Sequence, residues 1–142
     1  MRHVKPHGAL YNAAAKNIAL ASLVAKAAEG LILVGPPGSA LEEAAQEAGL
    51  AFAAEGFVDR LYQSSGALTP RAEAGAIIEN ITARADQASA IAGGNVFKAA
   101  DGNLKLSVKT LCIHSDSPGA VETARATRAK LEENGFTIRS FA

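Results

Sequence analysis

Hydrophobic residues along the chain gather in short, wholly apolar runs and in longer stretches where they recur every three or four positions. The short runs are typical of strands covered on both faces in a parallel sheet, and the longer period is typical of helices. This pattern predicts strands at residues 2–7, 31–34, 50–54, 108–114 and 136–141, helices at 11–29, 38–48, 77–92 and 118–133, and a less regular segment at 95–106 that turns at 101–103. Strands that alternate with helices predict an α/β fold with a mainly parallel sheet.

One stretch, residues 57–75, has no clean period and is rich in charged, hydroxyl-bearing and glycine residues. We expect it to form a long loop. Loops of this length are uncommon in compact domains, and those that are ordered often carry function. In parallel sheets ligands also bind where the strands end, so this loop and the predicted strand ends are the candidate places for a site.

The composition indicates one domain over residues 1–142, because 49% of the residues are hydrophobic and no repeat or linker interrupts the pattern. Fourteen basic and fourteen acidic residues are interspersed, so we expect no nucleic-acid partner and no membrane partner. The single cysteine, Cys112, excludes an internal disulfide and fits a reducing compartment, which makes the cytoplasm the expected location. No apolar run has the length of a membrane span, and the N-terminus does not resemble a signal peptide.

The densest group of ionisable residues lies at the N-terminus. In an extended strand, His3, Lys5 and His7 project from one face. Pro6 lacks a backbone donor and Gly8 permits a sharp turn, so the strand is expected to end there, with His7 at its tip. The alternative is an edge strand with solvated polar residues.

A second group of candidate residues follows the strand at 108–114. His114 stands at the end of this strand and Asp116 comes two residues later, close enough to orient an imidazole for proton transfer near neutral pH. The alternative is that residues 115–118 only begin the next helix, with Ser117 as its N-cap. Both interpretations can hold for different atoms.

Carboxylates and arginines supply the remaining candidates. Glu55 and Asp59 stand four residues apart with Arg60 beside them, and they form either a carboxylate cluster or a salt-bridged loop. Arg71 has the planar fork that binds a substrate carboxylate, and the alternative is an ordinary surface arginine.

Neither a nucleotide motif nor a metal motif is evident. Residues 35–39 lack the lysine and the spacing of a phosphate-binding loop, although the following helix could present its amides to an anion. His7, His114 and Asp116 are acceptable ligands for zinc or manganese, but no two of them have a tight ligand spacing. We therefore predict no metal site.

Four segments carry a family resemblance: residues 3–12 (His-Val-Lys-Pro-His-Gly-Ala-Leu-Tyr-Asn), 55–62 (Glu-Gly-Phe-Val-Asp-Arg-Leu-Tyr), 68–71 (Leu-Thr-Pro-Arg) with Gly75 and Ala76, and 111–116 (Leu-Cys-Ile-His-Ser-Asp). Together they resemble the LamB/YcsF family, the A subunit of bacterial ATP-dependent 5-oxoprolinase. The resemblance covers essentially the whole chain. It implies a β/α barrel of the glycoside hydrolase/deacetylase type that works with subunits B and C. The implied reaction opens 5-oxo-L-proline to L-glutamate, coupled to ATP hydrolysis in the full complex.

The chain departs from the family pattern in two respects. Residues 114–118 read His-Ser-Asp-Ser-Pro where the family has His-Gly-Asp-Asn-Pro, so a glycine is lost. The acidic and histidine-containing segments that open the family's barrel are absent, and a closed barrel usually takes about 250 residues. We therefore expect the C-terminal part of the fold, a partial barrel lacking its N-terminal strands. Its open sheet edge predicts a homo-oligomer, and its incomplete site predicts little activity for this chain alone.

Strand-end geometry and the resemblance together assign roles to the candidate residues. His7 and His114 are assigned to proton transfer, and Asp116 to orienting or activating. Substrate binding is assigned to Lys5, Glu55, Asp59, Arg60 and Arg71. Of these, Lys5 and Arg71 would bind anionic groups. Two alternatives remain. One is a metal-dependent hydrolase or deacetylase acting on amides or carbohydrates, and the other is a non-catalytic assembly remnant.

Overall fold

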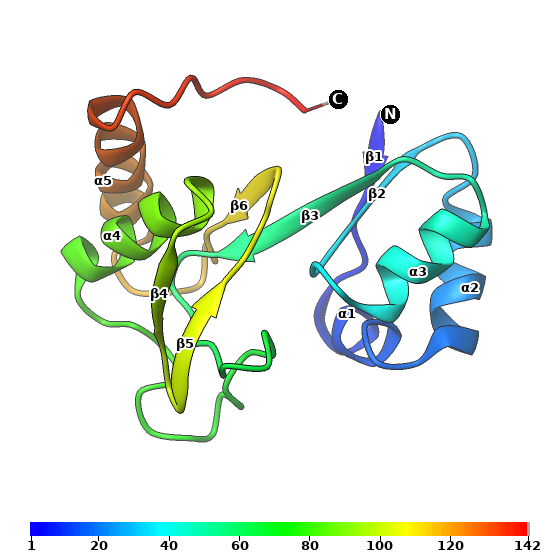
Figure 1. Cartoon of the computed structure of the whole chain (residues 1–142), viewed down its shortest axis with the longest axis horizontal. Helices are drawn as coiled ribbons and strands as arrows, with labels where there is room; N and C mark the ends of the chain where they lie inside the picture. The colour runs from blue at the N-terminus through cyan, green and yellow to red at the C-terminus, as the bar shows by residue number, and fades with distance from the viewer. Residues whose placement is uncertain (142) are drawn as a thin grey trace. The chain divides into compact units, whose positions relative to one another are not determined.

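The computed structural model describes residues 1–141, and their helices and strands follow an α/β order (Figure 1). The helices are α1 (Gly8–Ala14), α2 (Ile18–Ala27), α3 (Ala40–Glu47), α4 (Ile81–Ala92) and α5 (Ala120–Glu133). The strands are β1 (His3–Val4), β2 (Ile32–Gly35), β3 (Phe52–Phe57), β4 (Val96–Ala99), β5 (Gly102–Lys105) and β6 (Thr110–Cys112). Hydrogen bonds join four strands in the order β1-β2-β3-β6, with β1, β2 and β3 parallel, and β4 and β5 form a separate antiparallel hairpin.

The chain divides into two compact units, which we describe separately. The first comprises residues 1–55 together with the C-terminal residues from Ser140, and it contains α1, α2, α3, β1 and β2. The second comprises residues 56–139 and contains α4, α5, the hairpin and β6. β3 begins in the first unit and ends in the second.

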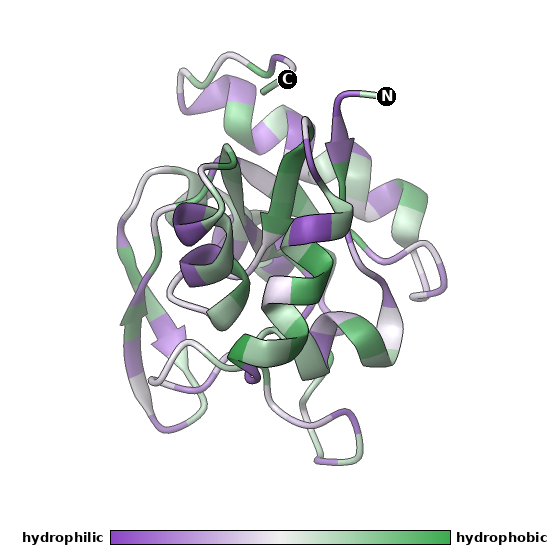
Figure 2. Cartoon of the chain, turned by 90° about the vertical axis from the view of Figure 1, so that its right-hand side faces the viewer, coloured by the Kyte–Doolittle hydropathy of each residue, from purple (hydrophilic) through white to green (hydrophobic). Residues whose placement is uncertain are grey.

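Alanine dominates the core of the first unit, where Leu33 and Leu41 are the largest fully buried side chains. Small side chains on α2 and α3 allow these helices to pack closely against each other, and α3 also packs against β2. Figure 2 shows apolar and polar residues in alternating bands along the helices of this unit. This is the periodicity from which helices were predicted.

The single helix predicted at residues 11–29 is wrong, because α1 and α2 are separate helices. Between them, the side-chain oxygen of Asn17 accepts a hydrogen bond from the backbone N–H of Leu20 at 3.0 Å. Such an N-cap starts a new helix even where the apolar period continues without a break. α1 also starts earlier than the predicted helix, at Gly8, whose φ of +59° suits glycine.

The third strand extends further than predicted, since β3 runs to Phe57 and Glu55 lies inside it. Gly56 lies in a crowded part of the strand, where an added Cβ would lie only 2.8 Å from Cγ2 of Ile91. Glycine is therefore the residue that allows this part of β3 to pack against α4. Asp59 follows two residues after the strand ends.

In the second unit, the segment predicted to turn at residues 101–103 is a hairpin of β4 and β5 that turns earlier, at residues 100–101. Three other boundaries also differ from the prediction. α4 begins at Ile81, later than predicted, because Asn80 caps it by accepting from the backbone N–H of Ala83 at 2.9 Å. α5 begins at Ala120 with Gly119 as its N-cap residue, so the assignment of Ser117 as N-cap is wrong. β6 is limited to three residues.

The strand predicted at residues 136–141 is also wrong, because that segment has no regular secondary structure. Among the described residues, no helix combines the length and the apolar character that crossing a membrane requires.

Candidate active site

His114, just after β6, forms a close contact with a buried carboxylate in the second unit. Its Nδ1 lies 2.8 Å from Oδ1 and 3.1 Å from Oδ2 of Asp59, and its backbone N–H lies 3.4 Å from Oδ2. The hydroxyl of Ser117 donates to the same Oδ2 at 2.9 Å. Asp59 is fully buried, whereas 21% of the His114 side chain is exposed. The carboxylate is therefore hidden from solvent behind a partly exposed imidazole.

Opposing influences set the charge of Asp59. Burial is the largest influence and by itself raises the pKa of Asp59, but the hydrogen bonds from His114 and Ser117 and the charge of the imidazole together hold that pKa below its ordinary value. The carboxyl group is therefore ionised at neutral pH. An ionised carboxylate in this position fixes the orientation of the imidazole.

The ionised state of Asp59 also determines the tautomer of His114. A carboxylate has no proton to donate, so Nδ1 of His114 carries the proton of their hydrogen bond. Nε2 then holds the lone pair when the imidazole is neutral. The ring of His114 stacks on the ring of Phe57, with 5.3 Å between centroids and 13° between planes. With the ring held in this way, Nε2 is suited to accept and return a proton.

The predicted pairing of His114 with Asp116 is wrong. Asp116 is exposed, and its carboxylate lies 3.9 Å from Nη1 of Arg71, while Nδ1 of His114 is bound by Asp59. The physical reason is a turn at residues 114–117, closed by a hydrogen bond of 3.3 Å from the backbone N–H of Ser117 to the carbonyl of His114. This turn brings Ser117 against Asp59. A catalytic role for Asp116 stays a prediction.

The two arginines predicted to bind substrate have different surroundings. Arg60 is buried and donates from Nε to the carbonyl of Ala76 at 3.2 Å and from Nη2 to the carbonyl of Thr69 at 2.6 Å. Burial, and then the charge of Arg71, lower the pKa of Arg60 from its ordinary value. These hydrogen bonds of Arg60 hold the loop that contains Thr69 and Ala76. By contrast, 51% of the Arg71 side chain is exposed. Substrate binding by either arginine stays a prediction.

The first unit contains a second buried carboxylate, Glu55. Nζ of Lys5 lies 2.8 Å from its Oε1 and 2.7 Å from its Oε2, and the hydroxyl of Tyr11 donates to Oε2 at 3.3 Å. The ammonium of Lys5 also lies 5.6 Å from the centre of the Tyr11 ring. Glu55 and Tyr11 are buried, and Lys5 is half-buried. The structure thus joins two predicted substrate-binding residues, Lys5 and Glu55, in an ion pair.

The other two histidines lie in the first unit and are exposed. The prediction that His7 stands at a strand tip is wrong, because β1 ends at Val4 and His7 is instead the N-cap residue of α1. The ring of His3 packs against Phe141, with 5.2 Å between ring centroids. Proton transfer by His7 stays a prediction.

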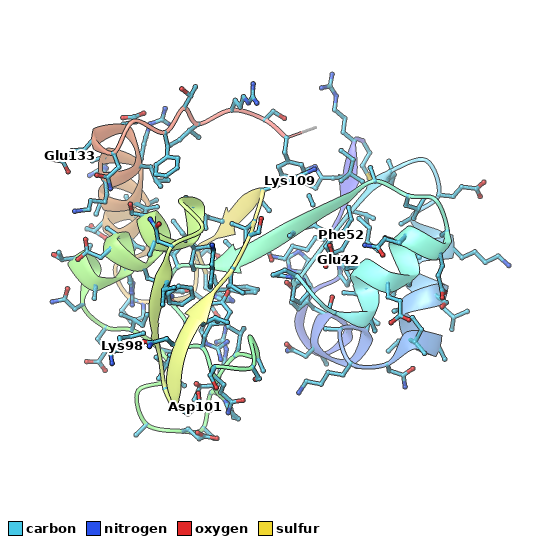
Figure 3. All side chains as sticks on the ribbon, in the orientation of Figure 1. Glu42, Phe52, Lys98, Asp101, Lys109 and Glu133 are labelled. Atoms are coloured by element: carbon cyan, nitrogen blue, oxygen red, sulfur yellow. The ribbon has the colours of Figure 1, made fainter. Side chains whose placement is uncertain are left out.

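The loop at residues 35–39 is poorly suited to a phosphate. Glu42 on α3 (Figure 3) accepts a hydrogen bond from the backbone N–H of Gly38 at 2.7 Å, and the hydroxyl of Ser39 donates to the carbonyl of Pro36 at 2.7 Å. The carboxylate of Glu42 therefore occupies an amide that an anion would need and adds negative charge beside it. Within residues 1–141, no three His, Cys, Asp or Glu side chains are grouped so that they could hold a metal ion.

Comparison with known proteins assigns the chain to a family. A profile described as the LamB/YcsF family matches residues 1–142. The chain belongs to the LamB/YcsF family. The resemblance predicted from the four segments is thereby confirmed.

Curated relatives of this LamB/YcsF chain are named as the A subunit of 5-oxoprolinase. The protein from Methylococcus capsulatus is 45% identical over 141 residues, which cover 96% of this chain and 54% of the relative. The protein from Symbiobacterium thermophilum is 41% identical over 143 residues, which cover 97% of this chain and 55% of the relative. The chain thus spans a little over half the length of the curated relatives it matches.

A solved structure confirms the predicted fold class, a partial β/α barrel with a mainly parallel sheet. The crystal structure of the lactam utilization protein from Thermus thermophilus matches with a TM-score of 0.91 and 39% identity. The match covers 99% of this LamB/YcsF chain and 58% of the Thermus chain.

The sequence did not predict two hydroxyl contacts to the buried carboxylates of this LamB/YcsF chain. Tyr11 lies in one of the segments that carry the resemblance. Its contact could have been expected because the hydroxyl of a buried tyrosine usually needs a polar partner. Ser117 was assigned to helix capping, which a serine in a turn before a helix usually performs. Neither signal identifies the acceptor, because Glu55 and Asp59 are 44 and 58 residues away in sequence.

Proposed function

We propose that this chain is part of a 5-oxoprolinase A subunit, which opens 5-oxo-L-proline to L-glutamate with ATP hydrolysis. The names of the LamB/YcsF relatives support the reaction class. The observation that carries the proposal is the contact between His114 and Asp59. Both residues lie in segments that carry the family resemblance, and together they are suited to transfer a proton. In this proposal the chain works with subunits B and C.

His114 supplies the proton transfer that lactam opening requires. Water adds to the lactam carbonyl carbon, the C–N bond of the ring breaks, and the nitrogen leaves as an amine that gains a proton. Nε2 of His114 accepts the proton from water and returns one to the leaving nitrogen, while Asp59 stabilises the imidazolium between these steps. Acid–base catalysis of this type typically contributes about 10²–10⁴-fold.

ATP enters the proposal through the full assembly. Resonance makes a lactam unreactive toward water, which gives coupling to ATP hydrolysis a chemical reason. The loop at residues 35–39 does not fit a triphosphate, because Glu42 already occupies the amide of Gly38. No step is therefore assigned to ATP on this chain.

Arg71 is the residue we assign to the carboxylate of the substrate. It is half exposed, and its contact of 3.9 Å with Asp116 is loose, so a bidentate carboxylate can replace that contact. Lys5 is less suited to attract an anion than the sequence predicted, since Glu55 balances its charge. His7, exposed at the start of α1, remains a second proton-transfer candidate in this proposal.

Location and assembly complete the proposal. A cytoplasmic location is supported by the single cysteine, Cys112, because one cysteine cannot form a disulfide within the chain. Self-association is supported by exposed apolar side chains in each unit, including Leu23 and Val121.

The test is lactam opening by a complemented chain, which we define as this chain co-expressed with subunits B and C and with the part of the Thermus thermophilus protein that it does not match. We expect glutamate and ADP to form in equal amounts from 5-oxo-L-proline. The chain alone is expected to show little or no turnover.

A complemented chain that forms no glutamate would contradict the proposal and favour the non-catalytic alternative. Turnover that needs bound zinc or manganese and no ATP would favour the metal-dependent hydrolase. His114→Gln serves as the control that the activity belongs to this chain.

A further inference from the structure

Two polar side chains of α4, Arg84 and Gln87, are buried, with 2% and 8% of their surfaces exposed. They stand three residues apart and so lie on the same face of the helix. Arg84 forms no ion pair with a carboxylate among residues 1–141. Burying such groups is unfavourable unless their hydrogen bonds are well used. Their partners all lie in the second unit, next to the Asp59–His114 pair.

Gln87 binds the backbone around Asp59. Its Nε2 lies 3.0 Å from the carbonyl oxygen of Phe57, 3.2 Å from that of Val58 and 2.9 Å from that of Arg60. An amide has only two N–H groups, so the three carbonyls share them. The peptide groups that contain the carbonyls of Phe57, Val58 and Arg60 are thereby restrained, and these groups lie before and after Asp59 in the chain. This restraint on the backbone limits the directions in which the Asp59 side chain can point.

Arg84 reaches Asp59 by two routes. Its Nε donates to the carbonyl of Ile78 at 2.5 Å, and the backbone N–H of Ile78 in turn donates to the carbonyl of Asp59 at 3.0 Å. Its Nη1 donates to the carbonyl of Pro118 at 3.0 Å, which adjoins Ser117, the residue whose hydroxyl binds the Asp59 carboxylate. Arg84 also binds the hydroxyl of Thr123 on α5 at 2.8 Å.

We propose that Gln87 and Arg84 are positioning residues that hold Asp59 and Ser117 in the geometry needed to orient His114. α4 packs against α5, β4 and β6 (Figure 1). These contacts fix the helix from which Gln87 and Arg84 reach the segments that carry Asp59 and Ser117. The inference rests on the proposed function, because it supposes that His114 transfers protons. Pre-organisation of this type matters because small displacements of a proton-transfer group lower the rate steeply.

The test is an NMR titration of the full chain labelled with ¹³C-aspartate and ¹⁵N-histidine, with Gln87→Met as the variant. Met keeps the size of Gln87 and removes its N–H groups. When the hydrogen bonds from His114 and Ser117 weaken, burial prevails, so the pKa of Asp59 should rise in the variant. The Nδ1–H resonance of His114 should broaden through faster exchange with water. Spectra of Asp59→Asn and His114→Gln assign the signals.

Ala88→Gly is the matched control, since Ala88 is fully buried on the same helix and its replacement weakens α4 without removing a polar contact. It should lower the melting temperature and leave the Asp59 titration unchanged. If Gln87→Met lowers the melting temperature while both signals remain as in the parent chain, Gln87 is only structural and the proposal is overturned.

A second variant, Arg84→Lys, keeps the positive charge and loses the planar fork, and it carries the test if Gln87→Met does not fold. It should also raise the pKa of Asp59, through the loosened Ser117 turn, and an unchanged titration would overturn the role of Arg84. In the complemented chain, Gln87→Met should lower kcat about tenfold or more with KM nearly unchanged. Altered NMR signals with an unaltered kcat would support the positioning role of Gln87 and contradict the role of His114 in the proposed function.

Discussion

The two buried carboxylates among residues 1–141, Glu55 and Asp59, have similar surroundings but bind different nitrogen bases. In the first unit Glu55 binds Lys5 and the hydroxyl of Tyr11, and in the second unit Asp59 binds His114 and the hydroxyl of Ser117. Each carboxylate thus binds one nitrogen base and one hydroxyl, and Asp59 also accepts a hydrogen bond from the backbone N–H of His114.

The difference between the bases separates a fixed ion pair from a group that can exchange protons. An ammonium ordinarily keeps its proton in neutral solution, whereas an imidazole ordinarily gains and loses one near neutrality. The contact of Lys5 with Glu55 therefore joins the segment after β1 to β3. In the proposed function, the contact of His114 with Asp59 prepares the ring for proton transfer. The following predictions test this comparison.

The largest effect is expected for His114→Gln in the complemented chain, which should lose activity about 10²–10⁴-fold because the proton-transfer group is absent. The measurement is glutamate formation from 5-oxo-L-proline. Lys5→Met is the matched variant from the other cluster and should retain more activity per folded molecule. Equal losses in the two variants would remove the distinction between the clusters.

Glu55→Gln should lower the free energy of unfolding by about 1–3 kcal/mol, because the half-buried ammonium of Lys5 loses its counter-ion. Urea unfolding of the full chain measures the change. Combining Glu55→Gln with Lys5→Met should restore part of the loss, since no charge then stays unpaired. A double variant as unstable as the sum of the single ones would show that the two side chains do not interact.

Arg71→Met should raise KM for 5-oxo-L-proline about tenfold or more, because at least one charge-assisted hydrogen bond to the substrate carboxylate is lost, with stability changed by no more than about 0.5 kcal/mol. Steady-state kinetics of the complemented chain and thermal unfolding of the full chain provide the two values. Arg60→Met is the contrasting variant and should unfold more readily, because buried Arg60 holds the loop carbonyls of Thr69 and Ala76. An unchanged KM in Arg71→Met would exclude Arg71 from substrate binding.

The smallest effect is expected in the acid dependence of stability, because burial of Asp59 offsets part of the influence of its hydrogen bonds. Since the folded-state pKa of Asp59 is lowered, its contribution to stability is fully present above the unfolded-state pKa and is lost as pH falls through the folded-state value. Unfolding measured from pH 6 down to about pH 2 should therefore show a smaller loss of stability in Asp59→Asn than in the parent chain. Parallel curves would show that Asp59 titrates alike in both states.

Much of the fold was predictable because local patterns determine secondary structure. The apolar run at residues 31–34 and the period at residues 38–48 each indicated one element, and β2 and α3 lie there. Boundaries were wrong where a single side chain overrides the period, as Asn17 does between α1 and α2. Residues 136–141 do not form the predicted strand, so apolar residues alone did not suffice to predict one there.

The candidate site was predictable in its members and not in its pairings. His114, Asp59, Lys5 and Glu55 were all singled out, yet Asp116 was expected to orient the histidine because it is close in sequence. Closeness along the chain was the wrong measure there, since a turn places Ser117 against the carboxylate.

The sequence by itself determined the α/β class, the family and the residue types available for chemistry, because these follow from local periodicity and from segments that can be compared directly. Only the tertiary structure decided which base meets which carboxylate. Lys5 and Glu55 are 50 residues apart, and His114 and Asp59 are 55 residues apart. Such contacts depend on strand register, on where β3 ends and on the hydrogen bonds of Arg84 and Gln87 on α4 to backbone carbonyls. None of these can be deduced from spacing along the chain.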